Sequence, residues 1–316
     1  MFAKIFSFLI FGLFCLVGSS AALAQSYVAS TGDDGNPCNS SMPCRTVDRA
    51  LATASAGGSV ILMDAGPYNP FTIYQSVNVI AAPGTAPHII APTNSIPAIR
   101  IALPRGAFAY LEGLTVSADK PGGVGIQWQM PSKLLWMKNC AVLDFETGLR
   151  VTAGGNIVVD TCTFRNGFVG INMATRSETE PIYAAIQYSE VRFMRSIGIY
   201  CGSNTDVGIR NSLVSQCGTG IMGEALNLRD GGSDSSKAYV TVTNSSIFKN
   251  QLGVFQEATF SSSTRTLVRL GYNTIYYNLG IGILGGCNLG GNSVFGNGWP
   301  SIDEWWMSGH APACPF

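Results

Sequence analysis

Glycine followed by an aliphatic residue recurs along most of the chain, and apolar and polar residues alternate after each glycine. The pairs are Gly125-Ile126, Gly148-Leu149, Gly170-Ile171, Gly198-Ile199, Gly220-Ile221, Gly253-Val254 and Gly282-Ile283, at successive separations of 23, 22, 28, 22, 33 and 29 residues. A second alternating segment ends in Asn, as at Asn139, Asn211, Asn244, Asn273 and Asn292, and a third short apolar segment follows. Because alternation with a period of two is typical of β-strands, each unit should contain three short strands.

A unit of about 22 residues cannot bury an apolar face alone, whereas stacked units share one continuous core. The sequence therefore predicts an all-β solenoid in which strands of successive coils pair in parallel. The aliphatic residue of each glycine pair should line the interior. Alternation then places the next residue outside, which gives an outward row of Gln127, Arg150, Asn172 and Tyr200. The recurring Asn is expected at tight bends, where identical amides can form a ladder between coils.

Insertions lengthen the repeat at one position, between the glycine strand and the strand that ends in Asn. They cover residues 175–181, 228–238 and 259–266. Insertions at one repeat position emerge on one side of a solenoid, which is often the side that binds a ligand. This side is therefore the expected functional surface.

Both ends of the stack need a cover, because an uncovered coil invites the addition of another strand. Apolar residues over 46–55 follow a helical spacing, which predicts a short amphipathic helix at the N-terminal end. We divide the mature chain into an N-terminal cap (25–58), the coils (59–298) and a C-terminal cap (299–316). All three parts belong to one domain, which we expect to be monomeric.

Residues 1–24 have the features of a signal peptide. Lys4 provides a basic start, an apolar run follows, and Ala22-Leu23-Ala24 provides the small residues of a cleavage site before Gln25. The protein should therefore be exported to the periplasm or beyond the cell, with no membrane insertion after cleavage. The mature net charge of 18 − 19 = −1 gives the surface no general attraction for nucleic acid.

Eight cysteines remain after cleavage, since Cys15 belongs to the signal peptide. An even number in an oxidising compartment favours disulfides. We expect Cys38 to pair with Cys44 across a short loop, and Cys287 to pair with Cys314. Small buried thiols are the alternative for the other four cysteines, which are Cys140, Cys162, Cys201 and Cys217.

Two segments carry a resemblance to a known group of proteins. They are residues 27–46, which include Pro37-Cys38 and Pro43-Cys44-Arg45-Thr46, and residues 110–116. The chain resembles exported bacterial proteins of the pectin-lyase-like superfamily over essentially its whole mature length. This resemblance implies a right-handed parallel β-helix, and it directs attention to acidic polysaccharides, which enzymes of this superfamily cleave or modify.

The catalytic motifs that the resemblance implies are incomplete. Asn204-Thr205-Asp206 is similar to the first element of the polygalacturonase-like members, but the Asp-Asp, Gly-His-Gly and Arg-Ile-Lys elements are missing. Asp206 is therefore a weak catalytic candidate. The alternative is that Asp206 only forms a turn, where Asp is favoured. Arg150 is a second weak candidate, which could act as a base or bind a substrate carboxylate. The alternative is an ordinary arginine solvated on the surface. No metal site or cofactor is predicted, and Ca²⁺ would be needed only by a lyase.

Sugar binding without catalysis requires only aromatic rings and planar polar side chains along a groove. Arg150, Asn172 and Tyr200 form such a row, while Tyr183 and Tyr239 border two insertions. We therefore expect a non-catalytic binding or surface-structural module, with polysaccharide as its partner. The alternatives are a polysaccharide lyase or glycoside hydrolase, and an adhesin-like protein that binds other proteins.

Overall fold

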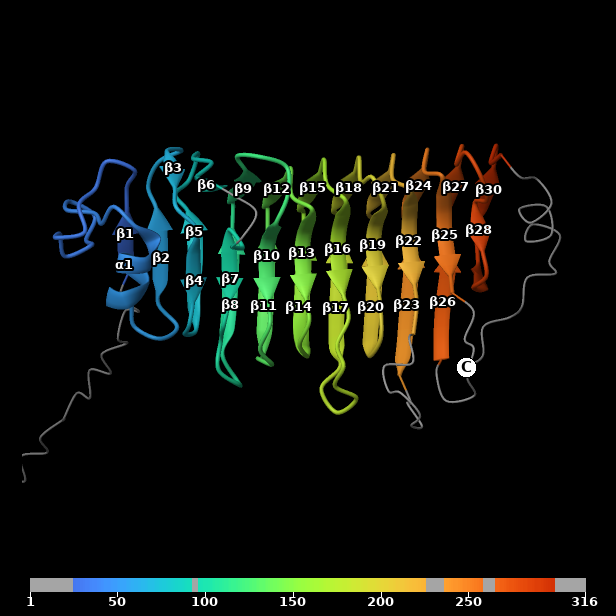
Figure 1. The fold of residues 1–316 in the computed structure, drawn as a ribbon, viewed down its shortest axis with the longest axis horizontal. Helices are drawn as coiled ribbons and strands as arrows, with labels where there is room; N and C mark the ends of the chain where they lie inside the picture. Colours follow the sequence, from blue (N-terminus) through green and yellow to red (C-terminus); the bar gives the residue numbers. More distant parts are fainter. Residues whose placement is uncertain (1–24, 93–95, 226–235, 258–264, 299–316) are drawn as a thin grey trace, which may run out of the picture.

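The chain winds into a right-handed parallel β-helix, as expected. The computed structural model describes residues 25–92, 96–225, 236–257 and 265–298, and within them three parallel sheets run along the whole stack (Figure 1). Each complete coil contributes one strand to each sheet. One α-helix and 30 strands form within the described residues.

The strands are grouped here by sheet, in the order in which they pair. Sheet A contains β1 (Gln25–Val28), β2 (Ser59–Leu62), β5 (Val77–Ala81), β8 (Phe108–Glu112), β11 (Leu134–Lys138), β14 (Gly155–Asp160), β17 (Ile182–Gln187), β20 (Thr205–Arg210), β23 (Lys237–Thr243), β26 (Arg265–Gly271) and β29 (Cys287–Gly290). Sheet B contains β3 (Pro67–Tyr68), β6 (His88–Ala91), β9 (Thr115–Ala118), β12 (Ala141–Leu143), β15 (Thr163–Arg165), β18 (Glu190–Arg192), β21 (Leu213–Ser215), β24 (Ser246–Phe248), β27 (Thr274–Tyr276) and β30 (Ser293–Phe295). Sheet C contains β4 (Phe71–Ile73), β7 (Ile99–Ile101), β10 (Val124–Trp128), β13 (Thr147–Val151), β16 (Val169–Met173), β19 (Ile197–Cys201), β22 (Thr219–Gly223), β25 (Leu252–Gln256) and β28 (Ile283–Leu284).

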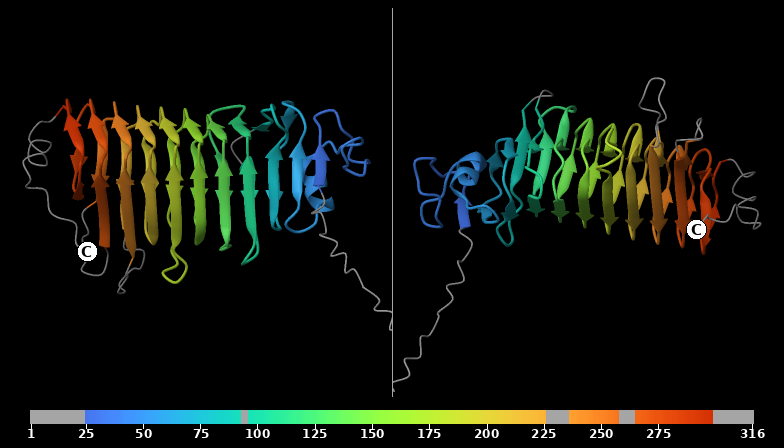
Figure 2. Two further views of the ribbon diagram at one scale, coloured as in Figure 1. Left: turned by 180° about the vertical axis from the view of Figure 1, so that it is seen from behind. Right: turned by 90° about the horizontal axis from the view of Figure 1, so that it is seen from below.

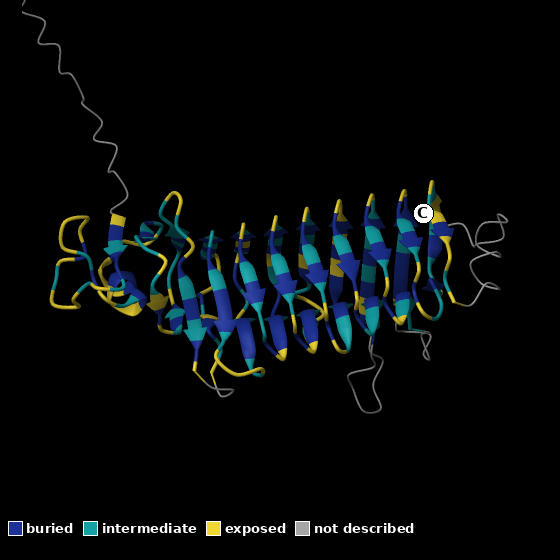
Figure 3. Ribbon diagram, turned by 90° about the horizontal axis from the view of Figure 1, so that it is seen from above, coloured by how far each residue is buried: buried dark blue, intermediate teal, exposed yellow. Residues whose placement is uncertain are grey.

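The aliphatic residues of the glycine pairs line the interior, as predicted. Ile126, Leu149, Ile171 and Ile199 pair in register on sheet C and are 0% exposed. The outward row also forms, because Gln127, Arg150, Asn172 and Tyr200 pair in register one position later. Exposed residues concentrate at the turns, while the strands consist mainly of buried and intermediate residues (Figure 3).

Glycine is needed in these pairs because neighbouring coils approach closely at that position. A Cβ on Gly148 would lie 2.6 Å from the carbonyl oxygen of Gly170 and 2.8 Å from Cδ1 of Phe164. Both distances are shorter than carbon contacts in a packed interior, which lie near 3.5–4.0 Å. The repeat of glycine in the sequence therefore reflects the spacing between coils.

The expected role of Asn at the bends is right for three coils and wrong for two. Asn139, Asn211 and Asn244 take positive φ angles of 52°, 49° and 50°. In the later coils, however, Tyr272 (φ 57°) and Gly291 (φ 70°) occupy the bend. The next residues, Asn273 and Asn292, lie one position further along, where their amides bond between coils.

Asn273 and Asn292 continue a ladder that serines form in earlier coils. The backbone N–H of Ser189 donates to Oγ of Ser212 (3.2 Å), and that of Ser212 donates to Oγ of Ser245 (3.2 Å). The N–H of Ser245 donates to Oδ1 of Asn273 (3.0 Å), and the N–H of Asn273 donates to Oδ1 of Asn292 (2.9 Å). Such bonds satisfy backbone groups that the turn removes from the sheets.

A second ladder runs through Asn250, Asn278 and Asn297 at the other edge of sheet B. The N–H of Asn250 donates to Oδ1 of Asn278 at 3.0 Å, and the N–H of Asn278 donates to Oδ1 of Asn297 at 2.9 Å. Asn250 and Asn278 are 0% and 1% exposed. The predicted amide ladder therefore exists, both here and between Asn273 and Asn292, where Nδ2 of Asn273 donates to Oδ1 of Asn292 at 3.0 Å.

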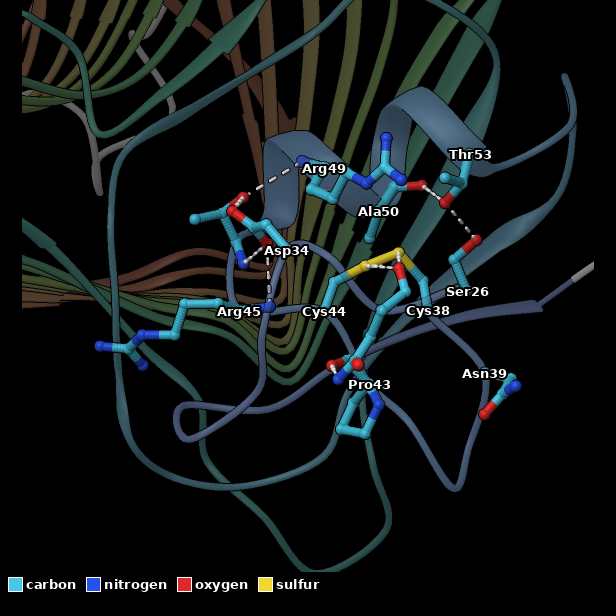
Figure 4. Close-up of a disulfide and its surroundings, with 12 residues drawn as sticks. Ser26, Asp34, Cys38, Asn39, Pro43, Cys44, Arg45, Arg49, Ala50 and Thr53 are labelled. Atoms are coloured by element: carbon cyan, nitrogen blue, oxygen red, sulfur yellow. Dashed lines mark hydrogen bonds between the residues drawn. A yellow bond between two sulfur atoms is a disulfide. The ribbon is translucent and has the colours of Figure 1, made fainter.

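The N-terminal end is covered by helix α1 (Val47–Thr53), as the apolar spacing predicted. Oγ1 of Thr46 accepts a hydrogen bond from the N–H of Arg49 and caps the helix. The carboxylate of Asp34 accepts three bonds, from the N–H groups of Arg45 and Thr46 and from the Thr46 hydroxyl. Cys38 and Cys44 form the expected disulfide in the preceding loop (Figure 4).

Other predicted features reach beyond the described residues. Cys287 is disulfide-bonded, but Cys314 and the predicted C-terminal cap (299–316) lie outside the described residues, as does the predicted signal peptide (1–24). The pairing of Cys287 with Cys314 therefore stays a prediction. Across the described ranges, no helix is long and apolar enough to span a membrane.

The bends yield a first testable prediction. Tyr188 has a φ of 50° and is 59% exposed, in the column where Asn139, Asn211 and Asn244 stand. Left-handed backbone geometry is unfavourable for most residues and better tolerated by Asn. We expect Tyr188→Asn to raise the free energy of unfolding by about 0.5–1 kcal/mol, measured by urea denaturation. A loss of stability would instead show that packing of the tyrosine ring outweighs the backbone term.

Candidate functional site

The candidate site surrounds the connection between β16 and β17, which spans residues 174–181 and projects beyond the neighbouring turns (Figures 1 and 2). This connection is the first of the three predicted insertions. The other two join β22 to β23 and β25 to β26, so all three lie between sheets C and A. Residues 226–235 and 258–264 of those two lie outside the described residues. Each insertion therefore joins a strand of sheet C to a strand of sheet A, which confirms that the three occupy the same position in the repeat.

Hydrogen bonds and an ion pair hold the loop 174–181 in place. The N–H of Thr175 donates to the carbonyl of Ser203 at 3.0 Å, and Nδ2 of Asn204 donates to the Thr175 carbonyl at 3.1 Å. Near the end of the loop, Glu180 forms an ion pair with Arg105, which lies in the connection between β7 and β8. That ion pair reaches across the turns of two intervening coils, so the loop is anchored at both ends.

Three hollows lie against this loop, with volumes of about 440, 300 and 280 Å³. The largest is on the side of sheet C and includes Tyr200. The second lies beneath the ion pair and includes Lys133 and Asn156. The third, which we call the tyrosine pocket, lies on the side of sheet A. Its lining consists of Glu178, Pro181, Tyr183, Asn204, Thr205, Asp206, Lys237 and Tyr239.

Strand register builds the floor of the tyrosine pocket. Tyr183 on β17 pairs with Asp206 on β20, which pairs with Tyr239 on β23. Since adjacent strands lie about 4.8 Å apart, the two tyrosines are separated by about 10 Å, with the carboxylate of Asp206 between them. The ring of Tyr183 is 52% exposed, and the guanidinium of Arg269 lies 5.9 Å from the centre of the Tyr239 ring.

The same pocket brings opposite charges together. Glu178 from the loop and Asp206 from β20 contribute carboxylates, and Lys237 contributes an ammonium group two residues before Tyr239. All three residues are exposed. Such a set can hydrogen-bond the hydroxyl groups of a sugar, and two carboxylates in one cavity can also exchange protons with a ligand.

The residues selected from sequence divide between two surfaces. Tyr183, Asp206 and Tyr239 meet in the tyrosine pocket, whereas Arg150 and Asn172 stay on the outer face of sheet C and line none of the three hollows. Nη2 of Arg150 donates to Oγ1 of Thr147 at 3.3 Å, so part of its donor capacity is used within its own strand.

Tyr200 lines the largest hollow, on the opposite side of the loop from the tyrosine pocket. Its hydroxyl donates to Oε2 of Glu224 at 2.8 Å. Burial, together with this bond to a carboxylate, raises the pKa of Tyr200 well above its usual range, so the phenol stays protonated. We therefore assign Tyr200 to the wall of that hollow and not to proton transfer.

Glu178 and Lys237 were not selected from the sequence. Lys237 could have been found, because it precedes Tyr239 by two and must share its face of the strand. Glu178 had no such signal, since a loop without a repeat has no register. In the ranges that the structure covers, no group of three or more His, Cys, Asp or Glu residues is placed to hold a metal ion.

Comparison with known proteins supports the fold. No protein-family model and no curated sequence matches the chain. Among solved structures, pectate lyase Pel9A aligns with a TM-score of 0.63 at 16% identity, covering 92% of this chain and 81% of the lyase. An alginate lyase from Paenibacillus aligns with a TM-score of 0.51 at 12% identity, over 79% of this chain and 91% of that one. The Dettilon tailspike protein aligns with a TM-score of 0.54 at 14% identity, over 86% of this chain and 54% of the tailspike. The chain thus shares the right-handed parallel β-helix of these proteins.

Proposed function

We propose that this protein is an exported polysaccharide-binding protein that holds a sugar ring between Tyr183 and Tyr239. The observation that carries the proposal is the register of the two tyrosines on either side of Asp206, beside the projecting loop. Ligand sites commonly combine aromatic walls with a few polar groups that fix orientation. In this pocket the rings would face the C–H groups of the sugar, and Asp206 would accept hydrogen bonds from its hydroxyls.

The spacing of the two tyrosines suits the thickness of one sugar ring. About 10 Å between their backbones leaves room for one ring in contact with both walls, since each van der Waals contact spans about 4 Å. The exposed charges of Glu178 and Lys237 stand at the rim, where they would select among sugars by charge. Two of the compared proteins, a pectate lyase and an alginate lyase by name, also support a glycan as the partner.

Export is part of the same proposal. The Cys38–Cys44 disulfide and the disulfide-bonded Cys287 fit an oxidising compartment, because reducing cytosol rarely retains structural disulfides. Residues 1–24 have the composition of a cleaved signal peptide. We infer that the mature protein acts in the periplasm or outside the cell, where polysaccharides are accessible.

Catalysis is a second candidate function, favoured by one specific observation. Glu178 and Asp206 line the same cavity, and glycoside hydrolysis uses two carboxylates that flank the scissile bond. Lys237 in the same cavity could instead remove a proton beside a uronate carboxylate, as a lyase requires. Either reaction would use the same bound sugar.

A single experiment separates binding from cleavage. The purified mature protein is incubated with acidic and neutral polysaccharides, with and without Ca²⁺. Affinity electrophoresis measures retention, absorbance detects unsaturated products, and a reducing-end assay detects hydrolysis. Retention without products is the expected result. Products with either assay would replace the binding function with lyase or hydrolase activity, and no retention of any polysaccharide would contradict the proposal.

The carboxylate variants refine this test. We expect Glu178→Gln and Asp206→Asn each to weaken retention by about three- to tenfold, because each replaces a charge-assisted hydrogen bond with a neutral one that is weaker by about 1 kcal/mol. In an enzyme, the same variants should instead retain polysaccharide and lose turnover by at least a hundredfold. Comparing retention with turnover for the two variants therefore distinguishes a binding carboxylate from a catalytic one.

A further inference from the structure

Two buried cysteines occupy the first positions of the serine and asparagine ladder. The N–H of Cys162 donates to Oγ of Ser189 at 3.1 Å, which places Cys162 one coil before Ser189 in that column. Ala141 pairs with Thr163, so the residues before them, Cys140 and Cys162, stand opposite each other in adjacent coils. The N–H of Thr163 donates to the carbonyl of Cys140 at 2.8 Å, which fixes this register.

Both thiols have the same local arrangement. Sγ of Cys140 donates to the Lys138 carbonyl at 3.4 Å, and Sγ of Cys162 donates to the Asp160 carbonyl at 3.3 Å. Their side chains therefore point the same way, and the two sulfurs are stacked along the axis of the solenoid. Backbones of adjacent strands lie about 4.8 Å apart, within the 4.4–6.8 Å that disulfides span between Cα atoms.

We propose that Cys140 and Cys162 form a disulfide that joins two successive coils of the exported protein. The two thiols lose two protons and two electrons as the sulfur–sulfur bond forms. A protein or glutathione disulfide accepts the electrons and is reduced to thiols. This inference rests on the proposed export and does not depend on the proposed glycan binding.

The structure also indicates when this bond must form. Cys140 and Cys162 are 2% and 1% exposed, so an oxidant cannot reach them in the folded chain. Oxidation must therefore occur during folding, before these two coils pack against each other.

The remaining free cysteines provide an internal control. Cys201 and Cys217 are also buried and lie at different repeat positions, on β19 and in the turn before β22. Burial raises the pKa of Cys217 to about 11. Neither residue has a cysteine opposite it, because Cys201 pairs with Gly223 and the N–H of Cys217 bonds to Asn250.

Peptide mapping tests the proposal directly. Protein purified from the periplasm is denatured without reductant, its thiols are alkylated, and it is cleaved with trypsin. Cleavage after Lys138, Arg150 and Arg165 separates the two cysteines into peptides 139–150 and 151–165. We expect these peptides to be linked in most chains, with Cys201 and Cys217 alkylated. Alkylation of Cys140 and Cys162 in most exported chains would overturn the proposal.

Two variants provide an independent measurement. Serine already occupies the same column at Ser189, Ser212 and Ser245, so the double variant Cys140→Ser/Cys162→Ser should fold. We expect reductant to lower the melting temperature of the exported wild type, and of Cys201→Ser, by more than it lowers that of the double variant. Cys38–Cys44 is present in all three proteins. An equal reductant effect in the three would contradict an inter-coil disulfide.

Discussion

Asn278→Leu should lower the free energy of unfolding by about 4 kcal/mol. Oδ1 of Asn278 accepts hydrogen bonds from both the N–H and Nδ2 of Asn250, each at 3.0 Å. Leucine would leave the N–H of Asn250 buried without a partner. It would also leave one hydrogen of Nδ2 unbonded, since Nδ2 keeps only its bond to the Val214 carbonyl at 3.3 Å. Each lost partner costs about 1–3 kcal/mol. Urea denaturation with an unchanged slope would measure the loss.

A substitution of the same type on the surface is the matched control. Asn156 on β14 is exposed, and its Nδ2 donates to the Lys133 carbonyl at 3.0 Å. Asn156→Leu should cost less than about 1 kcal/mol, because water can replace the lost bond. Equal losses for the two variants would show that the buried ladder does not stabilise the stack.

Removing both tyrosine rings should weaken polysaccharide binding by about a hundredfold. An aromatic contact contributes about 0.5–1.5 kcal/mol beyond its buried area, and 1.4 kcal/mol corresponds to tenfold in Kd. Tyr183→Ala and Tyr239→Ala should therefore each weaken binding by about tenfold, and the double variant by the product. Affinity electrophoresis or calorimetry with the retained polysaccharide measures the change.

Tyr188→Asn is the control for these variants. Tyr188 is exposed and follows the opposite end of β17 from Tyr183, so its replacement should leave binding unchanged. If the double variant binds as tightly as the wild type, the ligand lies elsewhere on the protein. If Tyr188→Asn weakens binding as well, the contact surface extends to the far edge of sheet A.

The repeat made the fold predictable because its physical cause is local. Gly148 must be glycine where neighbouring coils approach, and Leu149 must be apolar where it lines the interior. The positions of Asn273 and Asn292 were misassigned because Asn suits both a left-handed bend and an amide ladder. Only the hydrogen bonds of the folded chain show which of the two roles each residue has.

The site was less predictable, because it depends on register across coils of unequal length. Tyr183, Asp206 and Tyr239 are far apart in sequence, and the insertions between their strands hide the alignment. Arg150 and Asn172 were correctly placed on the outer face of sheet C, but the hollows form at the corner between sheets C and A. Alternation shows which face a residue occupies and does not show where a loop makes that face concave.

The location of all three insertions at one corner has an evolutionary consequence. Residues in the ladders and the glycine column each support two neighbouring coils, so their replacement affects the whole stack. Residues 176–180 between β16 and β17, by contrast, are exposed or half-buried, so they can change in length and composition with little effect on the interior. New ligand preferences can therefore arise at this corner through mutations that leave folding intact, and sequence divergence should accumulate there first.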